Sequence, residues 1–410
     1  MVARRRDWLP VCPIVRGGPT VTESLLPEEL STLIHKVFKP RATERSIAFL
    51  IDLPDAVVAD SEPWAQRRRM VAQWVAGLHK LESFPLEVHC VLYRNAHSNN
   101  GDLPEKAWYV SPDLEVDALA PNAESLANHP AVSFEQIFRS HPLLVAPTEF
   151  SATAPLKIAA RTFPFRAATM PGFSPSMIPA LRLDYEEINR RVLLLKSLLD
   201  EAVSATCRFL VDQSTERLLR LDLRHRTAHA SGGVFPDPGV AGNLPSGESY
   251  IVPYEGERKA DPSQSEGLLP VELDGDIVTY RISHNRAVEV IDAEQSEQGR
   301  REAKRIAEEP AYANIAELGL GVLDAFGVEP SGEILLDEKL GLHIAFGRSD
   351  HFGGIVGPKQ FSGPDAVVHI DRVYIPRIQP RVKVLEVQLI RENMPPLRIM
   401  KDGAYTIDFS

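Results

Sequence analysis

Four short segments between residues 242 and 374 carry acidic and imidazole side chains in apolar, glycine-containing surroundings. They are Gly-Asn-Leu-Pro-Ser-Gly-Glu at 242–248, Ala-Glu-Leu-Gly-Leu-Gly at 316–321, Asp-Glu-Lys-Leu-Gly-Leu-His at 337–343 and Val-His-Ile-Asp-Arg-Val-Tyr at 368–374. Carboxylates and imidazoles together bind divalent ions such as zinc, manganese or cobalt. Glycines beside them let the backbone approach an ion or a substrate closely. The spacing therefore predicts a metal centre assembled from distant parts of the chain.

The last of these segments has the most definite geometry. Its apolar residues predict a buried strand, on which residues two apart point to the same face. His369 and Asp371 are therefore expected to project together as half of a metal site, whereas Arg372 and Tyr374 face the other side as packing or interface residues. Taken alone, the pair is better explained as a core histidine with a carboxylate partner. The three other segments shift the balance towards a metal site.

The candidate ligands are two glutamates, two histidines and an aspartate, which suffice for one or two divalent ions: Glu248, Glu317, His343, His369 and Asp371. A metal-dependent hydrolase uses such ions to polarise a carbonyl and to lower the pKa of bound water. Two ions about 3.5–4 Å apart do both, and they need a bridging carboxylate. No Gly-x-Ser-x-Gly elbow and no cysteine motif is present, which argues against a serine or cysteine nucleophile.

Over residues 205–375 these segments resemble the thermophilic-type metallo-aminopeptidases, aminopeptidases T and S. The shared pattern is Asn-x-Pro-x-Gly-Glu at 243–248, Ala-Glu-Leu-Gly at 316–319, Asp-Glu at 337–338 followed by His343, Ala345 and Gly347, and His-x-Asp at 369–371. The resemblance implies that the five candidate residues bind two zinc, manganese or cobalt ions. It also implies an aminopeptidase that removes N-terminal residues from peptides, and a homodimer.

Two positions depart from that family. Asp350 stands where the family has a tyrosine, and Lys339 stands where it has an asparagine. A phenol can donate a hydrogen bond to a developing oxyanion, but an ionised carboxylate cannot. Asp350 is instead expected to bind a metal ion or a cationic group of the substrate. Glu338 is either a general base or an outer partner of the metal ligands.

A second class of enzyme stays open. The 2,5-dihydroxypyridine dioxygenases resemble these aminopeptidases but hold one ferrous ion with two histidines and one aspartate, which leaves positions free for oxygen and substrate. The presence of both Glu248 and Glu317 favours the two-metal hydrolase. The altered Asp350-His351 loop keeps a ring-cleaving iron dioxygenase as the alternative. A catalytically inactive binding module is the third interpretation.

The length of the chain suits two domains that position these side chains. Over residues 1–183 we expect an α/β domain, with helices at 27–38 and 61–81 and strands at 45–52, 86–94, 141–146 and 155–161. The proline-rich segment 162–180 is expected to cross between the domains or to lie over a cleft. Over residues 184–410 we expect a β-rich α+β metal domain. Its first helix begins at Asp184, with Glu187 completing a capping box.

Most of the second domain is predicted to be strand. The expected strands are 218–224, 249–254, 269–272, 277–283, 287–291, 366–375, 382–389 and 397–400. Asp274-Gly275 predicts a hairpin turn. Residues 297–309 are charged on all sides and predict a solvent-exposed helix.

The amino-acid composition limits the classes of partner that we expect the protein to bind. The net charge of -11 argues against nucleic acid or an anionic membrane surface as a partner. No apolar run has the length of a membrane span, and Pro10 and Pro13 interrupt any signal-peptide core. Three scattered cysteines without a CxxC pair fit a reducing cytoplasm. We therefore expect a cytoplasmic enzyme that acts on a peptide or small-molecule substrate.

Overall fold

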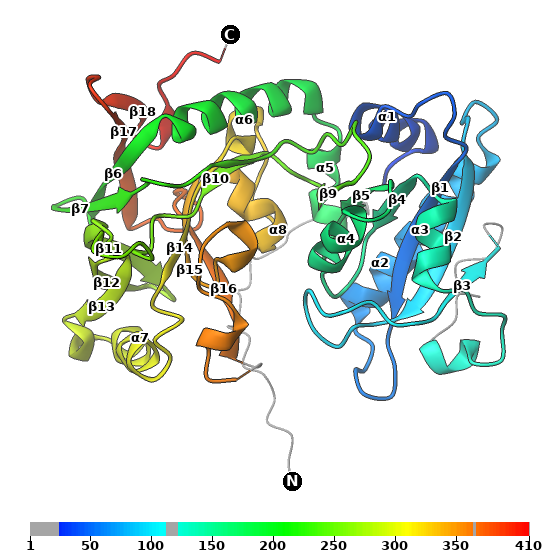
Figure 1. The fold of residues 1–410 in the computed structure, drawn as a ribbon, viewed down its shortest axis with the longest axis horizontal. Helices are drawn as coiled ribbons and strands as arrows, with labels where there is room; N and C mark the ends of the chain where they lie inside the picture. The colour runs from blue at the N-terminus through cyan, green and yellow to red at the C-terminus, as the bar shows by residue number, and fades with distance from the viewer. Residues whose placement is uncertain (1–23, 112–121, 364–365, 410) are drawn as a thin grey trace, which may run out of the picture.

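The computed structural model describes residues 24–111, 122–363 and 366–409. Within these ranges the strands form sheets of six, five and eight strands. The five-stranded sheet lies between the N-terminal half of the chain and the eight-stranded sheet (Figure 1). The predicted combination of an α/β domain with a β-rich α+β domain is confirmed.

The six-stranded sheet has the strand order β3-β2-β1-β4-β5-β9. Its strands are β1 (Ser46–Leu53), β2 (Glu87–Arg94), β3 (Ala107–Val110), β4 (Leu143–Ala146), β5 (Arg166–Thr169) and β9 (Val240–Asn243). Every neighbouring pair is parallel except β2 with β3. A parallel sheet needs helices on both faces, and all eight residues of β1 are accordingly buried.

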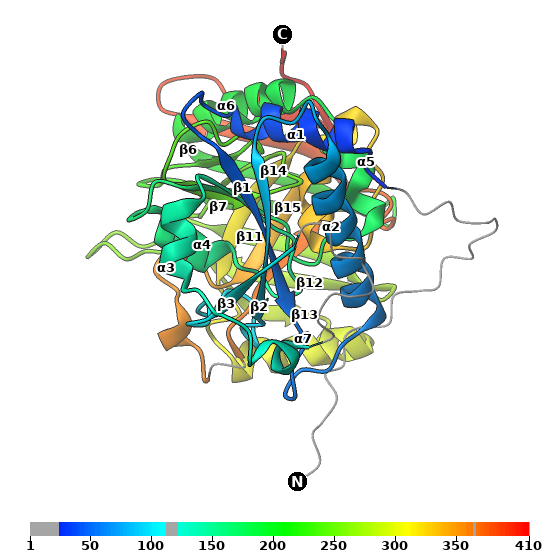
Figure 2. The same cartoon turned by 90° about the vertical axis from the view of Figure 1, so that its right-hand side faces the viewer.

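Helices cover both faces of this sheet (Figure 2). Helices α1 (Pro27–Phe38) and α2 (Glu62–Lys80) share a core with Phe49 and alternate residues of β1. Helices α3 (Phe134–Ser140) and α4 (Thr153–Ala160) share a second core with Leu50 on the opposite face. The helices and strands predicted over 27–94 and at 141–146 are therefore confirmed.

The strand predicted at 155–161 is wrong, because residues 155–160 belong to helix α4 and Arg161 is its C-cap. Leu156 and Ala160 are its buried residues, and their spacing of four places them on one helical face. Pro155 lies in the first turn, where a missing N–H does no harm. Segment 162–180 was expected to be a connection between domains or a loop over a cleft. It also contains strand β5 and the start of the short helix α5 (Ile178–Leu181).

Strand β9 ties the two halves together. It pairs with β5 although it follows residue 183, and the predicted boundary there stays a prediction. Asn243, at its end, accepts hydrogen bonds from the hydroxyls of Thr153 and Thr169 at 3.0 and 2.9 Å. The chain then enters strand β10 at Glu248, so the first candidate ligand lies where the two halves meet.

Helix α6 (Tyr185–Asp200) begins where predicted. The Asp184 carboxylate accepts a hydrogen bond from the backbone N–H of Glu186 and is the N-cap. The predicted capping box is wrong, because Glu187 instead forms ion pairs with Arg190 and Arg191 at 2.8 and 2.7 Å. Two guanidinium partners compete successfully for the carboxylate that a capping box would use.

The two remaining sheets contain most of the strands predicted after residue 184. The eight-stranded sheet comprises β6 (Ala202–Val211), β7 (Thr215–Asp222), β11 (Glu266–Leu273), β12 (Asp276–Ser283), β13 (Arg286–Ile291), β17 (Val382–Arg391), β18 (Leu397–Lys401) and β19 (Ala404–Tyr405). The five-stranded sheet comprises β8 (His229–Ser231), β10 (Glu248–Ile251), β14 (Ile315–Gly321), β15 (Leu342–Gly347) and β16 (His369–Val373). All neighbours in the five-stranded sheet are antiparallel.

One face of the five-stranded sheet packs on the eight-stranded sheet. The rings of Tyr374 and Phe209 lie 4.8 Å apart, and those of Phe346 and Tyr280 lie 4.9 Å apart. Arg372 donates a hydrogen bond to the Tyr312 hydroxyl at 3.2 Å. The predicted packing role of Arg372 and Tyr374 is confirmed, which leaves the opposite face of the sheet for His369 and Asp371.

Helix α7 (Glu297–Glu308) corrects one further expectation. It forms as predicted, but Glu302 is buried and accepts hydrogen bonds from the hydroxyls of Tyr280 and Tyr312 at 2.7 and 2.5 Å. One face of the helix therefore packs on the eight-stranded sheet and is not solvated.

Two further findings concern the cysteines and the helices. Cys90 and Cys207 are buried free thiols, and Cys12 lies outside the described residues. None of the helices in the described ranges combines the length and apolar character that a bilayer crossing requires.

Candidate metal centre

Four adjacent strands of the five-stranded sheet carry the five candidate ligands. Their order is β10, β14, β15 and β16, and they contribute respectively Glu248, Glu317, His343, and His369 with Asp371. Residues directly opposite each other on antiparallel strands share a face, as do residues two apart on one strand. The registers Glu248 to Gly321, Gly319 to His343 and Ala345 to Asp371 therefore place all five side chains on one face.

Small residues beside the ligands leave room for them. Ala345 lies between Glu317 and Asp371 in one cross-strand row, so the two carboxylates can approach over its methyl group. Gly319 lies opposite His343, and a β-carbon added there would come within 1.9 Å of the imidazole Nε2. The imidazole therefore lies directly over the Gly319 backbone, and a side chain at this position would displace it.

This contact gives a first prediction. Gly319→Ala is expected to move the His343 ring and to weaken binding of a divalent ion by about 10–100-fold, the range for changes that misorient a ligand. Calorimetric titration of ion-free protein with zinc or manganese measures the affinity. Gly363→Ala is the matched control, because a β-carbon there meets nothing within 4 Å. Equal affinities in the two variants would contradict this role of Gly319.

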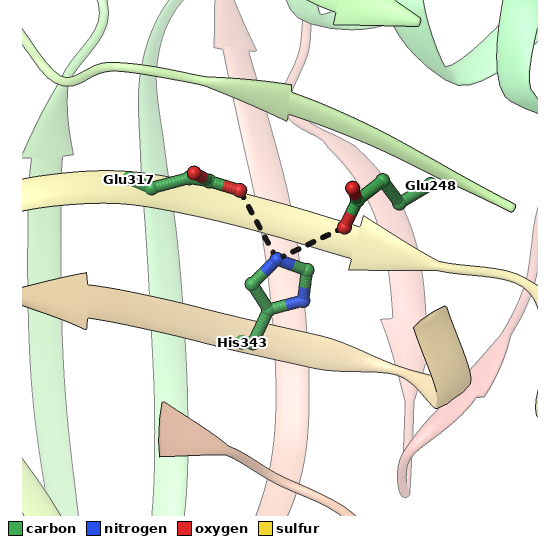
Figure 3. A group of neighbouring side chains, drawn as sticks. All are labelled: Glu248, Glu317 and His343. Carbon is green, nitrogen blue, oxygen red and sulfur yellow. Dashed lines mark hydrogen bonds and ion pairs between the residues drawn. The ribbon is translucent and has the colours of Figure 1, made fainter. Parts of the chain in front are cut away.

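The ligands form two groups that share one residue. Glu248, Glu317 and His343 form the first group, and Glu317, His369 and Asp371 form the second, with one ligand atom of each residue within 4.8 Å of the others in its group. In the first, the His343 Nε2 lies 3.1 Å from Glu317 Oε1 and 3.4 Å from Glu248 Oε2 (Figure 3). In the second, the His369 Nε2 lies 3.3 Å from Glu317 Oε2 and 3.5 Å from Asp371 Oδ1. The two oxygens of Glu317 thus face different histidines.

The donor set fits metal ions. Glu248 Oε2 and Asp371 Oδ1 are buried yet have no hydrogen-bond partner among the described residues, and a cation would satisfy such oxygens. Each imidazole Nδ1 faces a backbone carbonyl, that of Gly341 at 3.3 Å for His343 and that of Arg348 at 2.8 Å for His369. An Nδ1–H that donates to a carbonyl fixes the ring and leaves Nε2 free to bind a metal.

The charges of the centre act strongly on the histidines. Burial alone lowers the pKa of His343, but the hydrogen bond to Glu317 and the negative charge of Glu248 outweigh it and raise the pKa to about 9. The pKa of His369 is raised well above its ordinary value, because the Asp371 and Glu317 carboxylates outweigh burial. Without ions, these interactions favour the protonated form of both imidazoles.

A second prediction follows from these protons. Metal ions bind neutral imidazole, so binding to the ion-free protein is expected to release protons at neutral pH. Affinity should rise with pH up to about 9, by at most tenfold per pH unit for each proton displaced. Titration in buffers with different enthalpies of ionisation measures the number of protons released. The same titration above pH 9 should show fewer protons released per ion bound. A binding enthalpy that does not depend on the buffer at pH 7 would contradict the prediction.

Glu338 and Lys339 lie beside the first group. They form a short turn, η6 (Glu338–Leu340), between helix α8 (Ile334–Asp337) and strand β15. The Lys339 ammonium is fully buried, donates to Glu248 Oε1 at 2.6 Å and also donates to Glu338. Burial raises the pKa of Glu338 to about 8; Lys339 opposes this rise, and the negative charges of Glu248 and Asp371 add to it. A carboxyl group with this pKa can exchange a proton near neutral pH.

Asp350 lies in a different setting. It begins the short turn η7 (Asp350–Phe352), and its Oδ1 accepts a hydrogen bond from the Arg348 guanidinium at 2.6 Å. It belongs to neither ligand group among the described residues. The ring centroid of its neighbour His351 lies 5.6 Å from that of His369.

The fold can be compared with known proteins. No family model matches the chain, and no curated protein matches it in sequence. Two solved structures are similar over nearly their whole length. The 2,5-dihydroxypyridine dioxygenase from Pseudomonas putida KT2440 has a TM-score of 0.58 and 15% identity, covering 93% of this chain and 97% of that chain. Wild-type AmpT from Thermus thermophilus has a TM-score of 0.51 and 15% identity, covering 93% and 99%.

The chain has the fold of these two proteins. The predicted resemblance is therefore confirmed in architecture, for the aminopeptidase and for the dioxygenase alternative alike. At 15% identity the likeness establishes the fold alone.

Sequence reasoning missed a cation that this fold brings to the centre. Lys157 of helix α4 places its Nζ 5.9 Å from the centroid of the Phe352 ring, and that ring lies 5.5 Å from the His369 ring. Burial lowers the pKa of Lys157, and Glu248 and Glu317 contribute opposing charge interactions. No carboxylate of the described residues lies within ion-pair distance of it. Its position depends on the packing of the two halves, which no sequence motif reports.

A tyrosine near the carboxylates was also missed. Tyr250 lies opposite Gly319 on strand β10 and packs against Phe352, with ring centroids 4.8 Å apart. Burial raises its pKa well above the ordinary value, and the charges of Glu317 and Glu248 add to this effect. It therefore keeps its proton and can donate a hydrogen bond.

Proposed function

We propose that the protein is a metal-dependent hydrolase of the aminopeptidase type, in which the two ligand groups hold divalent zinc, manganese or cobalt ions. The observation that carries the proposal is the position of Glu317. Its Oε1 faces His343 and its Oε2 faces His369, at 3.1 and 3.3 Å from the respective Nε2 atoms. A carboxylate shared in this way is what a pair of hydrolytic metal ions requires as a bridge.

The neighbouring side chains supply the remaining roles. Bound ions would polarise the scissile carbonyl and lower the pKa of the attacking water. Glu338 accepts the proton of that water and passes it to the leaving amine. Tyr250, which keeps its proton, is a hydrogen-bond donor for the developing oxyanion, a role that Asp350 cannot fill as an ionised carboxylate.

The substrate proposed is a peptide with a free N-terminus, or a small molecule with a comparable amide. Its ammonium group binds an ion or a carboxylate, and Asp350 is the proposed carboxylate. The partly exposed position of Asp350 and its place next to His351 support this assignment. A homodimer and a cytoplasmic location are part of the same proposal, as the family resemblance and the cysteine content suggest.

The test is hydrolysis by protein reloaded with one metal at a time. Ion-free protein is loaded with zinc, manganese or cobalt and assayed on aminoacyl anilides and dipeptides, and N-acetylated versions of the same substrates serve as the control. We expect hydrolysis that depends on added metal and requires a free amino group. Hydrolysis of free and acetylated substrates at equal rates would exclude an aminopeptidase.

One observation favours the second candidate, a ring-cleaving dioxygenase with one ferrous ion. The Lys339 ammonium already lies against Glu248, so Glu317, His343, His369 and Asp371 remain without an internal lysine, and they include two imidazoles and an aspartate. Two imidazoles and one carboxylate are the ligands of many non-haem iron oxygenases. Oxygen uptake by iron-loaded protein with a dihydroxypyridine, combined with no peptide hydrolysis, would replace the hydrolase by this candidate. If the protein binds no metal, the catalytically inactive binding module would be the remaining interpretation.

A further inference from the structure

The two ligand groups share Glu317, but among the described residues a lysine forms an ion pair with a carboxylate of only one of them. We infer that the Lys339 ammonium is a built-in cation of the centre and makes the two groups unequal. The group of Glu317, His369 and Asp371 binds a divalent ion tightly, and the group of Glu248, Glu317 and His343 binds one weakly. The inference deepens the proposed function and rests on it only in requiring that the centre binds divalent ions.

Lys339 is held where it cannot leave. Its side chain has no exposure to solvent, and its ammonium donates to Glu248 Oε1 at 2.6 Å and to Glu338. The backbone at Lys339 packs on strand β14, where a β-carbon added at Gly321 would lie 2.2 Å from the Lys339 carbonyl carbon. A side chain that is buried and bonded to two carboxylates would lose both ion pairs if it moved into water when an ion arrives.

The first group therefore competes with this ammonium for Glu248. One oxygen of Glu248 is already satisfied by Lys339, so an ion there would have only Oε2 free of a hydrogen bond. That ion would also lie near a positive charge in a buried setting, where charges are weakly screened. Both effects weaken binding at this group without affecting the identity of its ligands.

Within the described residues, the carboxylates of the second group form ion pairs with histidines only. His369 contacts Glu317, Asp371 and the Arg348 carbonyl, and Asp371 Oδ1 has no hydrogen-bond partner among the described residues. No lysine or arginine of the described residues lies within ion-pair distance of Asp371. Its oxygens and the His369 Nε2 are free to bind an ion, together with Glu317 Oε2.

The difference between the groups can be measured without any enzyme assay. Ion-free protein is titrated with zinc or manganese, and the ions bound per chain are followed by calorimetry and by elemental analysis after gel filtration. We expect one tightly bound ion per chain and a second bound at least about 100-fold more weakly. Two ions bound with equal affinity by the unaltered protein would overturn the inference, with no need for a variant.

Replacing the lysine should remove the asymmetry. In Lys339→Asn the affinity for the second ion is expected to rise by at least about tenfold, since Glu248 and Glu338 lose their internal cation. Lys157→Met is the control for a general effect of nearby positive charge, and it should change the ratio of the two affinities far less. If Lys339→Asn does not fold, the double variant Lys339→Met with Glu338→Gln also removes one of the two buried carboxylates that lose their cation. An unchanged affinity ratio in a folded lysine variant would also overturn the inference.

The outcome is separate from that of the hydrolase test. A protein that binds two ions equally and hydrolyses peptides would retain the proposed function and reject the role of Lys339. A protein that binds one ion tightly and hydrolyses nothing would retain the role of Lys339 and reject the proposed hydrolase.

Discussion

Glu317→Gln is expected to abolish tight binding of divalent ions at both ligand groups and to lower kcat/KM by about 10³-fold or more, which corresponds to ~4 kcal/mol of transition-state stabilisation. Glu317 is the residue that belongs to both groups, and its two oxygens face His343 and His369. Glutamine has nearly the same shape, so the fold is retained. Its amide has only one oxygen and no charge, and therefore cannot bridge two ions.

A matched control separates this effect from the loss of any buried glutamate. Glu302 is also buried and accepts hydrogen bonds from Tyr280 and Tyr312, but it lies outside both groups. Glu302→Gln keeps an oxygen that can accept these bonds, so metal content should stay at the level of the unaltered protein. Elemental analysis of both variants after identical loading measures the difference. Full metal content in Glu317→Gln would mean that the centre does not bind ions as proposed.

Glu338→Gln is expected to lower kcat by about 10²–10⁴-fold while the ions stay bound, the range for removal of a general base. Glu338 lies beside the centre in contact with Lys339 but belongs to neither ligand group. Its neutral replacement keeps the size of the side chain and loses the ability to accept a proton. A kcat that falls together with the metal content would instead make Glu338 an outer partner of the ligands.

The pH profile distinguishes the two roles of Glu338 further. Burial raises the pKa of its carboxyl group to about 8, and a general base works only when it is ionised. Activity should therefore rise with pH through an acid limb. Bound divalent ions favour the ionised carboxylate, so the limb of the loaded enzyme lies below pH 8. In Glu338→Gln this limb should disappear, and its persistence would assign it to another group.

Much of the centre could be predicted from local patterns. The period of two along a strand correctly placed His369 with Asp371 on one face and Arg372 with Tyr374 on the other. The glycines around Glu317 and His343 were expected to permit close approach, and Gly319 lies directly beneath the imidazole. These features depend on strand geometry alone, which the identity and spacing of neighbouring residues determine.

Local patterns failed where tertiary contacts decided between alternatives. Residues 155–161 have a short apolar pattern that suits a strand or a helix, and packing of Leu156 and Ala160 against the six-stranded sheet selected the helix. Glu187 could have capped its helix, but Arg190 and Arg191 were better partners. Strand β9 pairs with β5 at the edge of the N-terminal sheet, a contact between residues about 74 apart in the chain that local patterns do not report.

By itself, the sequence determined which side chains could bind metal ions and which of them share a strand face, because these properties depend on residue type and on spacing of a few residues. The tertiary structure alone decided that Glu317 lies between both histidines, that the Lys339 ammonium bonds to Glu248, and that Lys157 reaches the centre from the other half of the chain. Coulomb and hydrogen-bond interactions depend on distances of a few ångströms between atoms. Such distances between segments far apart along the chain exist only once the sheets have paired and packed.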